Sequence, residues 1–170
     1  DTEFGNAAST EKAFATATYV VEHEFHIQRV TGVTMEPRGA LGSYDADKGL
    51  FTLVAGSGGA VRQQSEIAAV LGIDTSEIRV ISPDVGGNFG TRNRVYIEFG
   101  LVLFAAQKIN RPVKFTATRS ESFLTDYQGR DLVTRIALAM DDNGKFLGLK
   151  CDNISNVGAH CVSLSPLGKG

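Results

Sequence analysis

The sequence has 170 residues and a formal net charge of −2, enough length for one domain with a real core. Its charges form no basic stripe, so no nucleic acid and no anionic membrane surface is expected as a partner. The apolar runs are too short for a membrane span, and the start shows no signal-peptide pattern.

The first third of the chain favours strands separated by turns. Residues 10–16 favour a short helix, and β-branched and aromatic residues from 17 to 29 favour a long strand. Pro37 forces an extended conformation on the next segment. A turn at 45–49 and a strand at 50–54 then predict a hairpin.

The middle of the chain contains two predicted helices. Apolar residues at helical spacing predict an amphipathic helix over 60–71 that ends at Gly72. A short strand is expected at 78–81. A second helix is predicted over 93–109, and its apolar composition predicts burial on most of its circumference.

The last part of the chain favours strands again. We expect a strand at 113–117, a short helix from Arg119, and two long strands at 131–140 and 146–157. The Asn143-Gly144 pair between the long strands is a strong hairpin signal.

This order of elements predicts an α+β fold with two layers, in which a mixed β-sheet carries helices packed on one face. We expect residues 1–170 to form a single domain. The chain begins without a leader and its final run, 163–170, has no closing element. We therefore expect it to be cut from a longer polypeptide.

Two cysteines, Cys151 and Cys161, are too few for a zinc or iron–sulfur site of their own. We expect free thiols in a cytoplasmic protein, with Cys161 buried. His23 and His26 would face opposite sides of the predicted strand, which disfavours a metal pair.

Three glycines in five residues mark the segment 84–92, which reads Asp-Val-Gly-Gly-Asn-Phe-Gly-Thr-Arg. Glycine is unfavourable inside helices and strands, so this run predicts a loop. With a helix expected from Asn93, the loop amides and the positive helix end would point at one volume that suits an anion. The spacing fits neither a P-loop nor the dinucleotide fingerprint. A tight turn without a ligand is the alternative, and the apolar Phe89 favours a binding loop.

A second glycine-rich segment, 56–59, opens the helix predicted over 60–71. Its amides are a second place where the backbone could face a ligand, which leaves open a nucleotide-binding module that uses Gly56 to Gly59. The dinucleotide fingerprint is incomplete there because position 61 is Val.

Taken together, several segments resemble the molybdenum-binding large subunit of the xanthine oxidase, aldehyde oxidase and aerobic carbon monoxide dehydrogenase family. The segments are 35–38, 68–72, 80–92, 111–114 and 119–121. Each is weak alone, but their order and spacing are specific. The resemblance implies that one loop contacts molybdopterin, with the amides around Phe89 and Gly90 nearest to its dithiolene and oxygen ligands. The loop residues are Gly86, Gly87, Asn88, Phe89, Gly90, Thr91 and Arg92.

The resemblance also assigns Gly58 and Gly59 to the cofactor site. Family members carry a Gln at the position of Gly58, and its side chain hydrogen-bonds to a molybdenum oxo ligand. That donor is missing here. The family's catalytic Glu and substrate-facing residues map beyond residue 170, so we expect no catalytic residue and no direct metal ligand in this chain.

For the intact parent, the resemblance implies molybdopterin in its cytosine dinucleotide form and the hydroxylation of an aldehyde, an N-heterocycle or carbon monoxide. The implied partners are the remainder of the molybdenum subunit and iron–sulfur and flavin subunits or domains. The isolated fragment is expected to hold no cofactor and to be inactive. A structural domain that has lost its metal site, as recorded by Gly58, is the remaining alternative. Arg119 and Glu121 either fix the loop or form an ordinary helix start.

Overall fold

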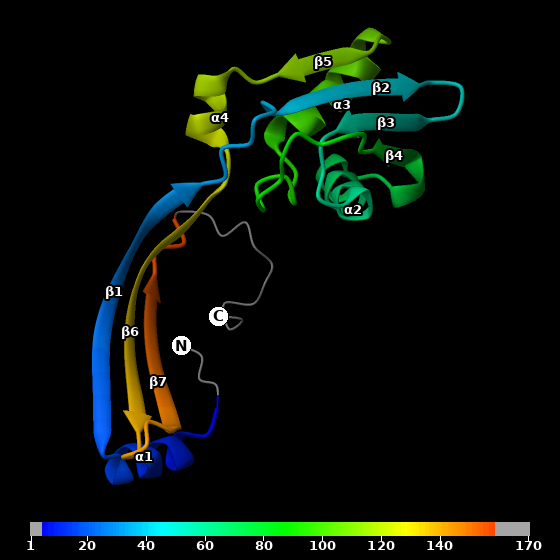
Figure 1. Ribbon diagram of the computed structural model, residues 1–170. Helices are drawn as coiled ribbons and strands as arrows, with labels where there is room; N and C mark the ends of the chain where they lie inside the picture. Colours follow the sequence, from blue (N-terminus) through cyan, green and yellow to red (C-terminus); the bar gives the residue numbers. More distant parts are fainter. Residues whose placement is uncertain (1–4, 159–170) are drawn as a thin grey trace. The chain divides into compact units, whose positions relative to one another are not determined.

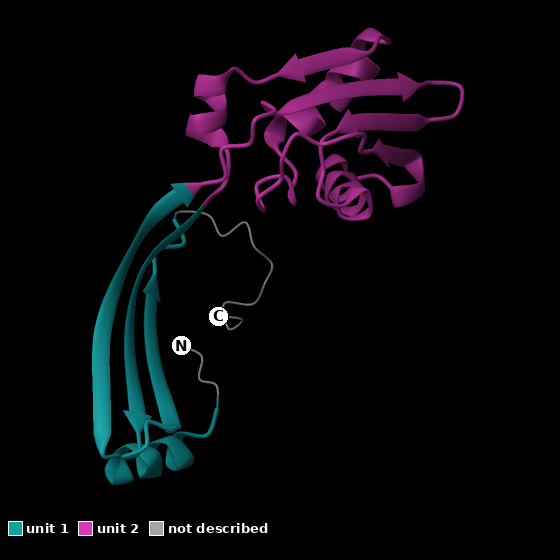
Figure 2. Ribbon diagram, in the orientation of Figure 1, with its two compact units in different colours: residues 1–30, 129–170 teal, residues 31–128 magenta. Residues whose placement is uncertain are grey.

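The structure, a computed structural model, describes residues 5–158 and divides the chain into two compact units (Figure 1, Figure 2). Unit 1 combines residues 1–30 with 129–170, and unit 2 consists of residues 31–128. We describe each unit by itself, and the expectation of a single domain over 1–170 stays a prediction.

Unit 1 is built on a three-stranded sheet in the order β1-β6-β7, with a helix against β7. Its elements are α1 (Ala7–Thr16), β1 (Tyr19–Thr31), β6 (Gln128–Met140) and β7 (Phe146–Ser155). β6 and β7 pair antiparallel, and Gly144 takes the left-handed conformation in the turn between them. The hairpin expected from Asn143-Gly144 is therefore confirmed.

Unit 2 contains a four-stranded mixed sheet in the order β4-β3-β2-β5. Its elements are β2 (Gly39–Asp45), β3 (Leu50–Ala55), α2 (Ala60–Leu71), a 3-10 turn (Thr75–Glu77), β4 (Ile78–Ile81), α3 (Ile97–Ile109), β5 (Val113–Thr116) and α4 (Arg119–Thr125). β3 and β4 run parallel, whereas β2 is antiparallel to both β3 and β5. The predicted first hairpin and the helix over 60–71 are confirmed.

The hydrophobic core of unit 2 lies between one face of this sheet and the helices α2 and α3 (Figure 1). Leu53 from the sheet, Ile67 from α2 and Leu103 from α3 are all buried. Gly42 allows the closest approach, because a Cβ there would lie 2.7 Å from the backbone of Val102. The position of α3 over β2 therefore depends on a residue without a side chain.

The α+β class is confirmed, but the strands form two sheets in the described residues where we had expected one. Length explains the separation. β1 and β6 have 13 residues each, whereas no strand of unit 2 exceeds seven. The long strands pair with one another because only they offer partners of matching length for their backbone groups.

Two expectations about the second helix are wrong. α3 begins at Ile97, with Tyr96 as its N-cap, rather than near Asn93. It is also not buried around most of its circumference, since Ile97 and Leu101 are exposed while Phe99 and Leu103 are buried. The residues before Ile97 are instead held by side-chain contacts described below.

Candidate functional site

The two glycine-rich segments predicted to form one site lie together in unit 2. We call residues 86–92 the glycine loop and residues 56–59 the junction. The Gly58 amide donates a hydrogen bond to the carbonyl oxygen of Arg92 at 3.1 Å. Gln63, buried in α2, places its side-chain Nε2 3.5 Å from the carbonyl oxygens of Gly56 and Arg94. The glycine loop and the junction are therefore neighbours.

The glycine loop folds into a turn centred on Phe89 and Gly90. The Asn88 carbonyl accepts hydrogen bonds from the Thr91 N–H and the Thr91 hydroxyl, both at 2.9 Å. Phe89 has φ +48° and Gly90 has φ +89°, so both central residues are left-handed, as in a type I′ turn. Phe89 is nonetheless 74% exposed. A large residue in this region costs about 1–2 kcal/mol, and here the strain presents an apolar ring to the outside.

Several amides expected to face a ligand are engaged within the protein. The Gly90 N–H donates to Asn88 Oδ1 at 2.9 Å, and the Gly86 N–H donates to Glu36 Oε2 at 2.8 Å. In the junction, the Gly59 N–H donates to Ser57 Oγ at 2.8 Å.

Other amides of the glycine loop remain available. The N–H groups of Gly87, Asn88 and Phe89 have no acceptor among residues 5–158. Backbone N–H groups without an internal acceptor are groups to which an anion can bind. Of the two amides expected nearest to a ligand, that of Gly90 is bonded within the loop, whereas that of Phe89 has no acceptor among the described residues. The helix begins at Ile97 and does not follow the glycine loop directly, as we had expected.

Arg92 anchors the end of the glycine loop in the protein interior. The side chain is 2% exposed, and its Nη2 donates to Thr34 Oγ1 at 2.7 Å and to the Glu36 carbonyl at 3.0 Å. Its Nη1 lies 3.4 Å from both carboxylate oxygens of Asp126. Thr91 is buried as well. Thr91 and Arg92, the last two residues predicted for the site, are therefore buried and anchor the loop to the protein interior.

A second buried arginine shares the same carboxylate. Arg38 is 1% exposed, pairs with Asp126, and donates to Glu98 at 2.8 Å. Although burial opposes its charge, the hydrogen bond that Arg38 donates to Glu98 and the nearby negative charges of Glu98 and Asp126 raise the pKa of Arg38. Asp126 is thus held between two permanent positive charges, Arg38 and Arg92, which ties β2, the glycine loop and the end of α4 together.

Tyr96 connects the same region to α3. Its hydroxyl donates to the carbonyl oxygen of Thr91 at 2.6 Å, and its ring lies under the guanidinium of Arg38 at 4.2 Å. Burial, aided by the negative charge of Asp126, raises the pKa of Tyr96 to about 12. The hydroxyl therefore stays a donor throughout the neutral range.

Close packing explains the glycines at the start of the loop. A Cβ on Gly86 would lie 2.5 Å from Glu36 Cβ, and one on Gly87 would lie 3.2 Å from Thr34 Cβ. Arg119 in turn donates to the carbonyl oxygens of Thr34 and Met35, at 2.7 and 2.6 Å. Arg119 thus supports the segment on which the loop rests.

Glu121 does not fix the loop but forms an ordinary helix start, which was the second role left open by the sequence. Its carboxylate accepts from the Thr118 N–H, and its own N–H donates to the Thr118 hydroxyl, which together form a capping box on α4. Sequence reasoning missed Asp126 and Tyr96 altogether, since neither stands in a glycine-rich or otherwise distinctive run. Arg38 was noticed only as part of the family resemblance.

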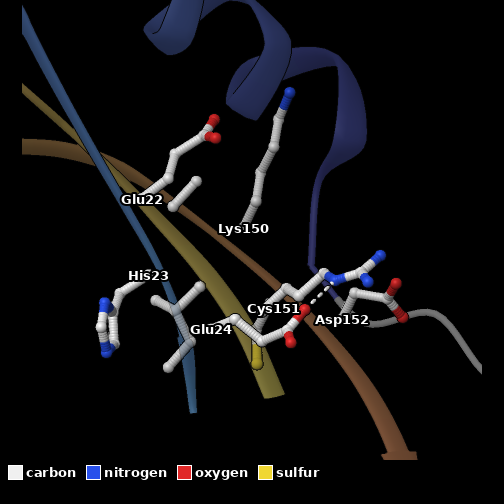
Figure 3. Close-up of a pocket in the computed structure, with 9 residues that line it drawn as sticks. Glu22, His23, Glu24, Lys150, Cys151 and Asp152 are labelled. Atoms are coloured by element: carbon white, nitrogen blue, oxygen red, sulfur yellow. Dashed lines mark hydrogen bonds and ion pairs between the residues drawn. The ribbon is translucent and has the colours of Figure 1, made fainter. Parts of the chain in front are cut away.

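Unit 1 contains a separate open pocket of about 430 Å³, shown in Figure 3. Glu24 accepts hydrogen bonds there from Arg135 at 2.6 Å and contacts His26 at 2.7 Å. Cys151 lines the pocket with an exposed side chain. Cys161 lies outside the described residues. None of the predicted cofactor-binding residues lines this pocket.

Within residues 5–158, no group of three or more His, Cys, Asp or Glu side chains is arranged to hold a metal ion. In the same part of the chain, no helix has the length and apolar character needed to cross a membrane.

Solved structures share this fold. Reconstituted CO dehydrogenase from Oligotropha carboxidovorans matches 89% of this chain and 19% of its own, with a TM-score of 0.81 and 28% sequence identity. Quinoline 2-oxidoreductase from Pseudomonas putida 86 matches 85% of this chain and 18% of its own, with a TM-score of 0.78 and 30% identity. The fold is thus one found in these oxidoreductases.

Sequence relatives agree with the structures. The carbon monoxide dehydrogenase large chain of Hydrogenophaga pseudoflava is 30% identical over 162 residues, which are 95% of this chain and 20% of that protein. The family model for the molybdopterin cofactor-binding domain matches residues 1–168. The chain therefore belongs to the molybdopterin cofactor-binding domain family, and the resemblance seen in the sequence is confirmed. This chain spans about a fifth of the length of the curated relatives it matches.

Proposed function

We propose that this chain is part of the cofactor-binding region of a molybdenum hydroxylase large subunit, and that the glycine loop and the junction form one side of its molybdopterin site. The observation that carries the proposal is the hydrogen bond between Gly58 and Arg92, which brings together the two segments that the family resemblance assigns to the cofactor. Membership of the molybdopterin cofactor-binding domain family supports it.

The free backbone donors of the glycine loop suit an anionic cofactor. The N–H groups of Gly87, Asn88 and Phe89 would donate to its anionic atoms, and the exposed ring of Phe89 would cover the site and exclude water. Gly59, where a Cβ would meet nothing within 4 Å, would leave room for close approach of the cofactor, and Gly58 would connect the junction to the glycine loop through its hydrogen bond to Arg92. Gly86, Gly90, Thr91 and Arg92 would shape the loop through their internal contacts.

When bound, such a cofactor supplies two-electron oxidation chemistry that protein side chains lack. This chain's part is to bind and orient it, and we assign no catalytic residue and no direct metal ligand within it. For the parent protein we propose the hydroxylation of an aldehyde, an N-heterocycle or carbon monoxide, with molybdopterin in the cytosine dinucleotide form. The isolated chain, with one side of the site only, would not retain the cofactor or turn over.

The surface of unit 1 supports further partners. Its sheet exposes Val21, Phe25 and Leu149, among other large apolar side chains. Exposed apolar surface of this kind marks an interaction site. We propose that the remainder of the molybdenum subunit covers it, and that the parent passes electrons to iron–sulfur and flavin subunits or domains in the cytoplasm.

Metal and pterin analysis of the purified parent tests the proposal. We expect about one molybdenum and one pterin per chain, and a large loss of both in Phe89→Ala. Phe104→Ala is the matched control, because Phe104 is also exposed but lies on α3, outside the glycine loop and the junction. A folded parent without molybdenum would contradict the proposal and would favour a structural domain.

A nucleotide-binding junction is the other alternative raised by the sequence. The Gly58 and Gly59 amides that would hold a phosphate are already bonded to Arg92 and Ser57, which argues against it. Thermal stabilisation of the chain by NAD or a nucleoside phosphate, lost in Gly58→Val, would support the nucleotide-binding alternative instead.

A further inference from the structure

The side-chain amides of Asn88 and Asn93 form a pair whose orientation is fixed by the backbone. The Gly90 N–H donates to one end of the Asn88 amide at 2.9 Å, so that end must be Oδ1. The other end, Nδ2, therefore faces Asn93 and donates to it at 2.9 Å. The Asn93 atom in this contact must be an acceptor, Oδ1.

In this series of donors and acceptors, the Nδ2 group of Asn93 is the one that is left over. Asn93 must direct its Nδ2 away from Asn88, and neither N–H of that group has an acceptor among the described residues. Asn93 is exposed. The result is a pair of N–H donors held in a set direction at the edge of the glycine loop.

The pair occupies the space of a side chain at position 58. A Cβ on Gly58 would lie 1.9 Å from Asn93 Oδ1 and 2.2 Å from Asn88 Nδ2. The φ angle of Gly58 lies outside the left-handed region, so the backbone itself would accept a side chain. The three atoms nearest to that Cβ all belong to the amide pair.

We propose that Asn93 is a cofactor-binding residue of this chain, whose Nδ2 donates to an anionic oxygen of the bound cofactor, and that Asn88 is its positioning residue. The assignment rests on the proposed function, because Asn93 lies next to the cofactor only if Gly58 and the glycine loop do. In this assignment, Asn93 provides the polar group that family members carry as a side chain at the position of Gly58.

The first experiment uses the 170-residue chain without any cofactor. Gly58→Ala should move the side-chain amide NMR signals of Asn88 and Asn93 and lower Tm by about 2 °C, because the new Cβ and the amide pair cannot share one space. Gly59→Ala is the matched control. A Cβ there meets nothing within 4 Å, so the Asn88 and Asn93 signals should stay unmoved. The NMR signals are the readout of this control, because Gly59 is the N-cap of α2 and alanine caps a helix less well than glycine.

A chain with both Asn88→Ala and Asn93→Ala completes the double-mutant cycle. In that background Gly58→Ala should no longer lower Tm. An equal effect of Gly58→Ala in both backgrounds, or unmoved asparagine signals in the first experiment, would overturn the role of the amide pair.

The second experiment uses the intact parent loaded with molybdenum cofactor. Asn93→Asp keeps the shape of the side chain and removes the donor, and Asn6→Asp in unit 1 is the control. About tenfold weaker cofactor retention would support a bond to the pterin or phosphate part of the cofactor. A changed molybdenum EPR spectrum at full cofactor content would support a bond on the metal side.

If neither cofactor content nor the EPR spectrum changes in Asn93→Asp, the assignment of Asn93 is overturned. A wild-type parent without molybdenum would overturn the proposed function instead, and with it the donor role of Asn93. The two failures are distinguishable because the first experiment measures the amide pair without cofactor.

Discussion

The Gly58 amide donates a hydrogen bond to the carbonyl oxygen of Arg92 at 3.1 Å, while the guanidinium of the same arginine is buried against Thr34 and Asp126. One residue thus connects the junction, the glycine loop and the buried charges of unit 2. An exposed loop that has to present backbone donors in a set geometry needs such an anchor, because its own turn contacts are weak.

Arg92→Ala tests this anchor. It leaves the buried Thr34 hydroxyl and Asp126 short of a partner, so we expect the free energy of unfolding to fall by about 3 kcal/mol. Urea unfolding of the two chains gives the difference. Arg79→Ala removes the same charge from an exposed position on β4 and should change little. Equal stability of the two variants would show that the anchor is unimportant.

Phe89→Gly should separate stability from function. Glycine relieves the left-handed strain at φ +48°, so we expect the free energy of unfolding to stay equal or to rise by up to about 1 kcal/mol. The parent carrying the same change should retain less cofactor, because the exposed ring is lost. A marked loss of stability in the chain would mean that the ring serves packing instead.

Tyr96→Phe removes a buried hydroxyl bonded to the Thr91 carbonyl and should cost about 1–2 kcal/mol. The pKa of Tyr96 is raised from 10.0 to about 12 by burial, so its contribution is complete below pH 10 and is lost as the pH rises through 12. Alkaline titration of tyrosine absorbance should show one group near pH 12 that is missing from the variant. If the group missing from the variant titrates near pH 10 instead, the burial of this hydroxyl is contradicted.

The stabilisation contributed by Glu66 should depend on pH in the opposite direction. Burial opposes its charge, but hydrogen bonds from Arg94 and Arg62 lower the pKa of Glu66 below 4.5. The stabilisation is therefore present above pH 4.5 and is lost as the pH falls through the lower, folded value. Between pH 7 and pH 3, Tm should fall further in the wild type than in Glu66→Gln. Parallel Tm curves would show that the Arg94 pair does not fix the segment after the glycine loop.

Local patterns predicted most elements of the fold. The hairpin at Asn143-Gly144 and the end of α2 at Gly72 each depend on residues close together in sequence, and each is present. The start of α3 was missed because it depends on a distant contact. Arg92 is drawn toward Thr34 and Asp126, which keeps the residues before Tyr96 out of the helix.

The candidate site was predicted in outline only. Runs of glycine identified the loop and the junction, and the family resemblance linked them. The pairing of Arg38 with Asp126, 88 positions apart, has no signature in a single sequence. Gly58 looked like the loss of a donor, whereas the structure shows its space filled by the amides of Asn88 and Asn93. A missing side chain can be interpreted only when its neighbours in space are known.

Determining the position of the cofactor in the loaded parent tests the central claim most directly. We predict that an experimental structure will show molybdopterin against the glycine loop, with its anionic atoms within hydrogen-bond distance of the Gly87, Asn88 and Phe89 amides and close to Gly58. A cofactor bound in the parent away from residues 86–92 and 56–59 would contradict the account.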